Sequence, residues 1–553
     1  MSVSKSPVSR ILNLLKLERN EITAVYFYAI LNGLIQLSLP VGVQAIIGYV
    51  LGASMRASLV VLIALVVLGV LVAGIMQINQ MKIIEKIQQK LFVRYSLAFA
   101  RHLPDLDLKR NDNVYLPELV NRFFDVQVLQ KSLSKILLEI PTAVIQIFFG
   151  LVLLSFYHPA FILFGIILVS ILVLILQFTG GRGLQTSLEK SKYKYKVAAW
   201  LEEMARVIKS IKLARNNDLH LRKADQEVSN YLDARNHHFR VLLFQFNVLV
   251  VFKTIITAAM LIVGTLLMVN QQLTVGQFIA AEIVILLVLN SVEKLIINLS
   301  SVYDTLTAVE KLAEITDKPL EKNGSLVLPD LQQGMKLELR EVSFGYTDDK
   351  QVLEQISMLI NPNEKICIAG KDSSGKSTLL RLLTGSYTDF KGAILVDDIP
   401  VGNYQLDSLR ARTGVLLGQQ DIFNGTLLEN ITLGNEQISL EAVRECALQS
   451  GLQDFVASLK EGFDTPLDPT GRRLPRSVAQ KILMARALAG QPRLLLLEEP
   501  WMNAKDQQKE HLIKTLLGLP NTTVVVVTND QEYADRCDKV FLLNENGTLV
   551  NNN

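Results

Sequence analysis

The stretch KICIAGKDSSGKST, residues 365–378, decides the fold of the C-terminal part of the chain. Its first six residues are mostly apolar and predict a buried strand, and the LLRLLTG that follows is helix-forming. Between the two, GKDSSGKST at residues 370–378 fits the pattern G-x-x-x-x-G-K-[ST] without a mismatch. This strand–loop–helix context indicates a P-loop, a backbone cradle for the phosphates of a nucleotide.

The P-loop pattern predicts a role for each kind of residue in it. Gly370 and Gly375 let the backbone wrap phosphate oxygens with its amide hydrogens pointing inward. Lys376 supplies a positive charge to the β- and γ-phosphates, and Ser377 can ligate Mg²⁺. The other loop residues that we expect at the nucleotide are Ser373, Ser374 and Thr378. The sequence therefore predicts ATP and Mg²⁺ as ligands.

The composition places much of the remaining chain in a membrane. Of 553 residues 50% are hydrophobic, and the mean hydropathy is positive, which is rare in soluble proteins. A formal net charge of +3 is small for this length and argues against a nucleic-acid partner. The three cysteines lack the spacing of a metal site, so we interpret them as incidental thiols in a reducing compartment. They are Cys367, Cys446 and Cys537.

Six apolar runs before residue 300 are long enough to cross a bilayer, which takes about 20 residues. They lie at 24–50, 57–79, 136–157, 159–179, 243–269 and 276–298. The connections after the first, third and fifth runs are short, and Arg56 is their only Lys or Arg. The connections after the second and fourth runs are long and basic, which places them in the cytoplasm. We therefore predict a multi-pass protein of the inner (cytoplasmic) membrane with both termini inside.

The two long connections are patterned like helices. Residues 80–102 and 185–213 mix apolar and charged residues at helical spacing and contain no proline, so we expect the membrane helices to continue into the cytoplasm. Each connection has a polar break, at Leu106–Asn113 and at Asn216–His220. A short crosswise helix at each break can dock on an ATP-binding domain; plain solvated loops are the alternative.

The division into domains follows from these patterns. The chain begins with a basic, amphipathic stretch that lacks the apolar core and cleavage site of a signal peptide. We expect this stretch to be an elbow helix on the cytoplasmic membrane face, with a disordered tail as the alternative. The predicted parts are the elbow at 1–23, a transmembrane domain at 24–315, a linker at 316–335 and an α/β nucleotide-binding domain at 336–553.

Six membrane segments, then VSFGY, the P-loop and RLLLLEEPWMNAKD in that order, resemble an ATP-binding-cassette (ABC) exporter of the fused half-transporter kind. The resemblance implies an α-helical six-span domain followed by an α/β P-loop domain. It also implies a homodimer or heterodimer in membrane lipid, with two ATP molecules between the P-loop of one subunit and the signature motif of the other. LPVGVQAIIGYVLG further resembles type I secretion transporters, which implies a periplasmic adaptor and an outer-membrane channel. About 23 residues precede the first span, so we expect no N-terminal peptidase domain.

The resemblance carries several roles onto single residues. Tyr346 in VSFGY matches the aromatic residue that stacks on adenine. In RLLLLEEP, Glu498 holds the place of an aspartate at the Mg²⁺, and Glu499 holds the place of the catalytic carboxylate that orients or deprotonates water. Asp506 matches the aspartate at the dimer seam. Gln419 in GQQDIFNGT is assigned to the glutamine that senses Mg²⁺, with Gln420 as its alternative.

Two motifs depart from the family pattern. The signature Leu-Ser-Gly-Gly-Gln aligns with Leu474–Val478, where Ser477 is a further nucleotide candidate. Pro475 has no amide hydrogen, and Arg476 can replace lost dipoles with a charge that suits phosphate. The alternative is that Arg476 is only a surface charge. In VVVVTND, Asn529 aligns with the histidine that bridges the γ-phosphate and the catalytic carboxylate; an amide can bond there but cannot carry a proton.

These departures predict an ATP-driven exporter whose hydrolysis is slow, because losing one transition-state contact commonly costs about 2.7–4 kcal/mol. We expect Glu499 to remain the base. Three hypotheses stay open: an exporter of a polypeptide, an exporter of a lipid or small molecule, and an ATP-binding regulator or scaffold with little turnover.

Polar residues within the spans are candidates to line a substrate cavity. They are Asn32, Gln36, Gln44, Gln146, Gln245, Asn247, Glu282 and Asn290. Glu282 lies roughly 9 Å inside the last span, where a carboxylate should face the interior or a water-filled path. Lys253 sits near an inner boundary, so we expect it to reach the interface by snorkelling.

Overall fold

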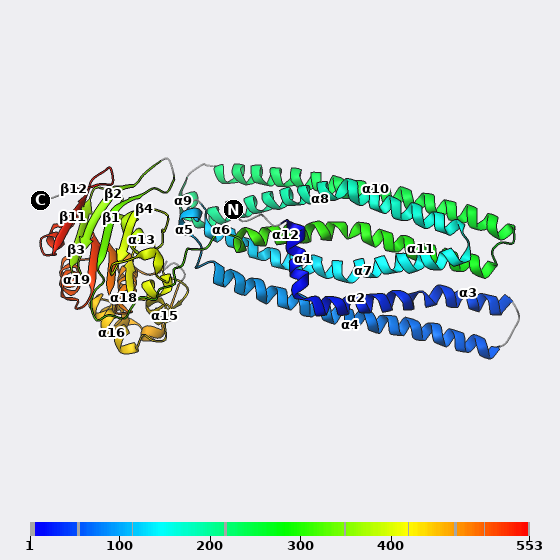
Figure 1. The fold of residues 1–553 in the computed structure, drawn as a ribbon, viewed down its shortest axis with the longest axis horizontal. Helices are drawn as coiled ribbons and strands as arrows, with labels where there is room; N and C mark the ends of the chain where they lie inside the picture. The colour runs from blue at the N-terminus through cyan, green and yellow to red at the C-terminus, as the bar shows by residue number, and fades with distance from the viewer. Residues whose placement is uncertain are drawn as a thin grey trace. The chain divides into compact units, whose positions relative to one another are not determined.

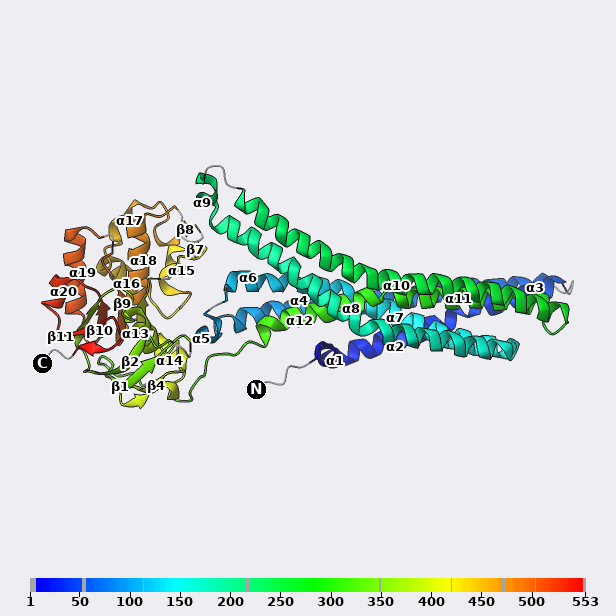
Figure 2. The ribbon, with the colours of Figure 1, turned by 90° about the horizontal axis from the view of Figure 1, so that it is seen from above.

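The fold, obtained as a computed structural model, consists of two units, each described by itself below (Figures 1 and 2). The helical unit comprises Met1–Pro104 and Val114–Lys318, and the cassette unit comprises Asp105–Asn113 and Pro319–Asn553. The structure describes residues 6–51, 56–112, 114–214, 218–347, 350–418, 420–468, 473–502 and 504–550.

Long helices run side by side in the helical unit (Figure 1). Its helices are α1 (Pro7–Leu17), α2 (Arg19–Gln36), α3 (Ser38–Leu51), α4 (Arg56–His102), α6 (Leu116–Val120), the 3₁₀ turn η1 (Asn121–Phe124), α7 (Asp125–Tyr157), α8 (Ala160–Arg206), α9 (Ile208–Leu213), α10 (Leu219–Val269), α11 (Val275–Ile297) and α12 (Leu299–Thr316). Within the described ranges, 6 helical stretches are long and apolar enough to cross a membrane, which confirms the predicted six spans. They are Arg19–Val50, Ser58–His102, Leu116–Tyr157, Ala160–Arg206, Leu219–Val269 and Val275–Thr316.

The first span is interrupted where α2 gives way to α3. The break falls at Leu37, and Pro40 stands in the first turn of α3. Proline has no amide hydrogen, so Pro40 cannot donate to the carbonyl of Gln36, and its ring also crowds that carbonyl. The interruption therefore follows from a single residue of the sequence.

The stretch predicted as an elbow forms helix α1. Its first residue is Pro7, and the side chain of Ser6 caps it by accepting a hydrogen bond from the amide of Ser9 at 3.3 Å. Arg10 pairs with Asp317, just after α12, at 2.7 Å and with Glu310 of α12 at 3.4 Å. Helix α1 is thus fastened to the last helix of this unit and to Asp317 just after it, and its position on the membrane face stays a prediction.

Five of the predicted cavity residues lie in hydrogen bonds between side chains of the helical unit. Asn32 accepts from Gln36 at 3.0 Å, Gln36 contacts Gln146, and Gln146 accepts from Ser291 at 2.8 Å, which joins α2, α7 and α11. Gln44 and Gln245 make similar bonds, to Tyr157 and to Thr179 and Tyr303. Such bonds between side chains contribute to the packing of membrane helices, and the cavity-lining role of these residues stays a prediction.

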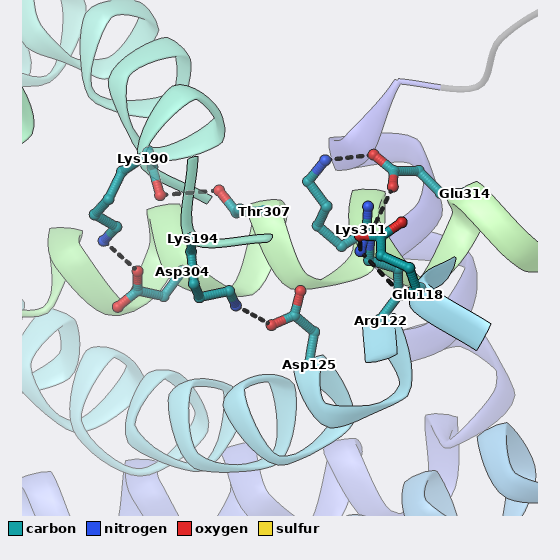
Figure 3. A network of polar contacts seen from close by, with 10 residues as sticks. Glu118, Arg122, Asp125, Lys190, Lys194, Asp304, Thr307, Lys311 and Glu314 are labelled. Carbon is teal, nitrogen blue, oxygen red and sulfur yellow. Dashed lines mark hydrogen bonds and ion pairs between the residues drawn. The ribbon is translucent and has the colours of Figure 1, made fainter. Parts of the chain in front are cut away.

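Ion pairs join the parts of these helices that we expect outside the membrane (Figure 3). Lys190 and Lys194 of α8 pair with Asp304 of α12 at 3.3 Å and with Asp125 of α7 at 2.8 Å. Arg122 reaches from η1 to the end of α12 in the same region. Because Asp125 is only 3% exposed, its pair with Lys194 compensates a buried charge.

The cassette unit contains two sheets, one antiparallel in the order β2-β1-β4-β5 and one mostly parallel in the order β12-β11-β3-β10-β9-β6. Their strands are β1 (Leu337–Phe344), β2 (Leu353–Ile360), β3 (Lys365–Gly370), β4 (Lys391–Val396), β5 (Ile399–Pro400), β6 (Thr413–Leu416), β9 (Leu494–Glu498), β10 (Thr523–Val527), β11 (Lys539–Leu543) and β12 (Leu549–Val550), and a further small ribbon pairs β7 (Gly425–Thr426) with β8 (Pro466–Leu467). The predicted strand β3 lies between β11 and β10, and its apolar run is buried as both faces of a parallel sheet require.

Helices accompany both sheets of the cassette unit. They are α5 (Leu108–Asn111), α13 (Lys376–Leu383), the 3₁₀ turn η2 (Val401–Asn403), α14 (Leu406–Ala411), α15 (Leu427–Thr432), α16 (Leu440–Gln449), α17 (Gln453–Ser458), the 3₁₀ turn η3 (Gly462–Asp464), α18 (Arg476–Leu488), α19 (Asp506–Gly518) and α20 (Gln531–Ala534). An α/β domain follows the six-span domain in the chain, which confirms the predicted fold class. Ligands of such parallel sheets bind at the carboxyl ends of the strands, so that edge is where the site should lie.

Helix α5 lies in the first predicted break and belongs to the cassette unit. Leu106 forms a β-bridge with Leu320. Lys109 donates to the carbonyl of Asp389 at 2.8 Å and lies 5.0 Å from the ring centre of Phe344. This break thus docks on the ATP-binding domain, as predicted. In the second break, residues 215–217 lie outside the described ranges, so docking there stays a prediction.

Arg493 ties the incoming linker to the core of the cassette unit. The side chain is buried at the start of β9 and pairs with Asp397 at 2.8 Å. It also donates to the carbonyls of Gln333 at 2.7 Å and Pro329 at 3.2 Å. Each of these contacts is a charge-assisted hydrogen bond, so the linker enters β1 in one fixed path.

Candidate nucleotide site

The P-loop turns sharply between β3 and α13. Gly370 has φ of 152° and Gly375 has φ of 95°, both in the region that favours glycine. A Cβ at Gly370 would lie 2.3 Å from the carbonyl oxygen of Leu543, so no larger residue fits there. Ser373 also has positive φ, at 66°, and Ser374 is buried. The loop is therefore curled by backbone conformations that these residues permit.

Lys376 folds over the loop that precedes it. Its ammonium donates to the carbonyls of Gly370 and Lys371, both at 2.6 Å. The charge therefore lies at the mouth of the curled loop, where the sequence predicted a contact with the β- and γ-phosphates.

Ser377 and Glu498 meet at the carboxyl edge of the parallel sheet. The hydroxyl of Ser377 donates to one carboxylate oxygen of Glu498, and the amide of Gly418 donates to the other at 2.9 Å. A hydroxyl and a carboxylate are the oxygen ligands that Mg²⁺ accepts beside water and phosphate. The described ranges hold no group of 3 or more His, Cys, Asp or Glu that could bind a metal.

Of the two glutamines that the sequence offered next to this pair, the structure describes one. Gln419 lies outside the described residues. The side chain of its alternative, Gln420, accepts a hydrogen bond from the amide of Leu417 at 3.3 Å within its own turn. The contact between Gly418 and Glu498 does bring this segment to the end of β9, where the assigned glutamine is needed.

Glu499 follows β9 in a strained conformation. Its φ of 41° is unusual for a residue with a side chain, and its amide donates to the carbonyl of Val527 at 3.0 Å. The carboxylate accepts a hydrogen bond from the hydroxyl of Thr528 at 3.0 Å. Burial raises the pKa of Glu499, although the Thr528 hydrogen bond and the charge of Lys376 oppose this rise. A carboxylate whose pKa lies above its ordinary value is a better proton acceptor.

Asn529 lies beside the P-loop, and its side chain contacts the backbone of that loop. The side-chain oxygen of Asn529 accepts a hydrogen bond from the amide of Gly370 at 3.0 Å. The end of β10 is thereby tied to the end of β3. Sequence reasoning missed the neighbouring Thr528, although its place directly after an apolar strand, one residue before Asn529, was a usable signal.

Tyr346 is fixed from several sides. Its hydroxyl lies 3.1 Å from the hydroxyl of Thr378 and accepts from Arg381 at 3.3 Å. Its ring meets the rings of Phe344 and Tyr387 edge to face, with centres 5.2 and 5.7 Å apart. The predicted adenine-stacking residue is therefore linked to the first turn of α13.

The residues of the signature side stand apart from this cluster. Arg476 and Ser477 begin α18, directly after Pro475, and Asp506 begins α19. Arg476 is exposed and takes part in none of the ion pairs of the described ranges, whereas nearby Arg473 pairs with Asp468 at 3.1 Å. Within the described chain no hydrogen bond or ion pair joins these residues to the P-loop, in keeping with their expected role toward a second subunit.

Two family models match the chain. The model described as "ABC transporter transmembrane region" covers residues 22–292, and the model described as "ABC transporter" covers residues 353–502. The first match covers most of the helical unit together with Asp105–Asn113 of the cassette unit. The second lies within the cassette unit and includes the P-loop, Glu498 and Glu499.

Curated relatives include exporters whose names state different substrates. The "Alpha-hemolysin translocation ATP-binding protein HlyB" of Escherichia coli O157:H7 is 26% identical over 471 residues, which are 83% of this chain and 65% of that protein. An "ATP-dependent lipid A-core flippase" of Saccharophagus degradans is 30% identical over 247 residues, 44% of this chain and 42% of that protein. The chain thus matches just under two thirds of the first relative's length and less than half of the second's.

A solved structure has the same fold. It is the "Structure of a bacterial Atm1-family ABC exporter with ATP bound", with a TM-score of 0.84, 19% identity, and coverage of 97% of this chain and 96% of that one. At this identity the likeness concerns the fold alone.

Proposed function

This chain belongs to the ABC transporters as an exporter subunit, and on that premise we propose that it hydrolyses ATP slowly to move a polypeptide out of the cytoplasm. The proposed unit is a dimer, homomeric or heteromeric, as the likeness to half-transporters implies, and among the described residues no hydrogen bond or ion pair joins the signature residues to the P-loop of their own chain. The observation that carries the ATPase proposal is the carboxylate of Glu499, which is held by Thr528 and has a raised pKa.

We assign the chemistry to few residues. Glu499 accepts the proton of the attacking water, and Lys376 neutralises charge that develops on the phosphates. Ser377 and Glu498 would hold Mg²⁺, which when bound would neutralise phosphate oxygens. The side-chain oxygen of Asn529 holds the amide of Gly370 at the entrance of the P-loop. An amide can form hydrogen bonds but cannot carry a proton as the usual histidine can, so that function of the histidine is lost. This loss and the altered signature support slow turnover.

The test is phosphate release by the purified protein in lipid discs. We expect slow but measurable release by the natural protein and loss of that release in Glu499→Gln, which keeps size and hydrogen bonding but removes the proton acceptor. Glu436→Gln is the matched control, because Glu436 is an exposed carboxylate outside the site. Release that Glu499→Gln leaves unchanged would refute the assignment of the base.

A polypeptide substrate is supported by the similarity to HlyB over 83% of this chain. The similarity to a lipid A-core flippase supports a second candidate, a lipid exporter. Stimulation of phosphate release by lipid and not by unfolded polypeptide would favour the flippase-like function. The polypeptide function also calls for an adaptor and an outer-membrane channel, which co-purification from native membranes would detect. Tight ATP binding without any phosphate release would favour a regulator.

A further inference from the structure

Polar side chains of α10 and α11 gather on a face that the amide network of the helical unit does not use. In α11, Asn290 and Glu293 follow Glu282 by 8 and 11 residues, which at 100° per residue places the three within about 80° of one another around the helix. Asn290 is exposed, and Glu282 and Glu293 are partly exposed. This face is therefore open in the single subunit.

Lys253 of α10 joins this face. Its ammonium pairs with the carboxylate of Glu293 at 2.8 Å and lies 3.5 Å from the amide oxygen of Asn290. The structure gives Lys253 a partner on the neighbouring helix, and the predicted snorkelling of Lys253 to the interface stays a prediction. The side chains of Lys253 and Glu293 remain 37% and 32% exposed, so one side of the pair is uncovered.

The pair lies within the predicted spans. Lys253 stands ten residues inside the run 243–269 and Glu293 five residues inside the run 276–298, or about 15 and 7 Å along the helix axes. Charges at such depth are costly against lipid and face the bundle interior or a water-filled cavity. An ion pair with one uncovered side therefore needs a polar surface opposite that side.

We propose that this face of α11, with Lys253, is a wall of the transport path, and that the Lys253–Glu293 pair opens to bind charged side chains of a polypeptide. This proposal deepens the proposed function, on which it rests. A carboxylate of the substrate can take the place of Glu293 at Lys253, and an ammonium can take the place of Lys253 at Glu293. Glu282, toward the other end of the helix, adds a carboxylate that makes no ion pair within the described ranges. A lipid tail could replace neither partner.

The first test asks whether water reaches this face. Asn290→Cys is made in the full-length protein with Cys367, Cys446 and Cys537 replaced by serine, and is reconstituted in lipid discs. Ile262→Cys is the matched control, because Ile262 is exposed but lies nine residues from Lys253, on the opposite side of α10. We expect charged methanethiosulfonates to modify Asn290→Cys and to spare Ile262→Cys. Equal reactivity, or an inert Asn290→Cys, would overturn the proposal.

The second test asks whether the pair sets the local charge. In the Asn290→Cys protein, Lys253→Met should lower the ratio of anionic to cationic reagent rates about three- to tenfold, and Glu293→Gln should raise it. The double exchange of Lys253→Glu with Glu293→Lys retains a pair and controls for damaged folding. A ratio that neither single change moves would contradict the proposed role.

The third test asks for the substrate class. Reduced, carboxymethylated α-lactalbumin, an unfolded charged polypeptide, should protect Asn290→Cys from the reagents, and short-chain phosphatidylcholine should not. The reverse result would overturn the polypeptide class. Phosphate release is measured on the same samples. Labelling of Asn290→Cys without phosphate release would refute the ATPase function alone. Phosphate release with an unreactive Asn290→Cys would refute only the proposal that this face lines the transport path.

Discussion

The P-loop side and the signature side of the cassette unit differ in how firmly their residues are held. On the P-loop side, Lys376, Ser377, Glu499 and Asn529 each make a hydrogen bond to another residue of the site. On the signature side, Arg476 is exposed at the start of α18. The difference supports the proposal that one chain organises its own P-loop residues for nucleotide, whereas its signature residues act toward a second subunit.

The largest effect is expected from a substitution on the P-loop side. Lys376→Ala removes the charge at the mouth of the P-loop, and hydrogen bonds to charged groups are worth about 1.5–3 kcal/mol each. We expect ATP binding to weaken about a hundredfold or more, measured with a fluorescent ATP analogue. Lys460→Ala, which removes an exposed lysine elsewhere in the cassette unit, should bind normally. Undiminished binding by Lys376→Ala would contradict the assignment of the P-loop.

Glu499→Gln should separate binding from hydrolysis on the same side. Phosphate release should fall about 10²–10⁴-fold, the usual contribution of a positioned base, while ATP binding persists. Trapped ATP in the variant, measured by filter retention, is the positive sign of this separation. If ATP binding were lost together with phosphate release, Glu499 would serve folding and would not be the base.

The pH dependence of phosphate release sharpens this assignment. Burial raises the pKa of Glu499 above its ordinary value of 4.5, so its basic form is lost at a higher pH than that of an exposed glutamate. Release should therefore fall as the pH drops through this raised pKa, and the slow residual rate of Glu499→Gln should lack that fall. An acid limb that persists unchanged in Glu499→Gln would belong to another group.

Asn529→His tests whether the missing histidine limits hydrolysis on the P-loop side. An imidazole can bridge the phosphate and the carboxylate, so release should rise about tenfold, less than the full effect of a transition-state contact because the tie to Gly370 is disturbed. Asn529→Ala removes that tie without adding a ring and should slow release instead. If the histidine variant shows no rise, the limiting defect lies on the signature side.

The smallest effect is expected from a substitution on the signature side. Arg476→Ala should raise the ATP concentration for half-maximal release about threefold in the dimer, because an exposed charge contributes about 1 kcal/mol or less. Arg473→Ala is the matched control, since Arg473 already pairs with Asp468 within its own chain. Equal behaviour of the two variants would make Arg476 a surface charge and leave Pro475 as the relevant departure.

The sequence could predict what depends on local patterns. The P-loop is a contiguous motif, and the six spans are contiguous apolar runs, so both were readable before any contact was known. The bond of Thr528 to Glu499 and the pairing of Lys253 with Glu293 join residues that are far apart along the chain. Side-chain partners of this kind depend on how helices rotate and strands align, and periodicity along one segment does not contain that information.

The attachment of α5 has a consequence for domain exchange. Residues Asp105–Asn113 pack with the cassette unit, although they lie between two membrane helices in the chain. The ATPase module is therefore split into two pieces, and a fragment that starts at Pro319 would lack the bridge of Leu106 to Leu320 and the cover of Lys109 over Phe344. A chimera that borrows a foreign ATPase should carry that ATPase's own version of Asp105–Asn113 along with it.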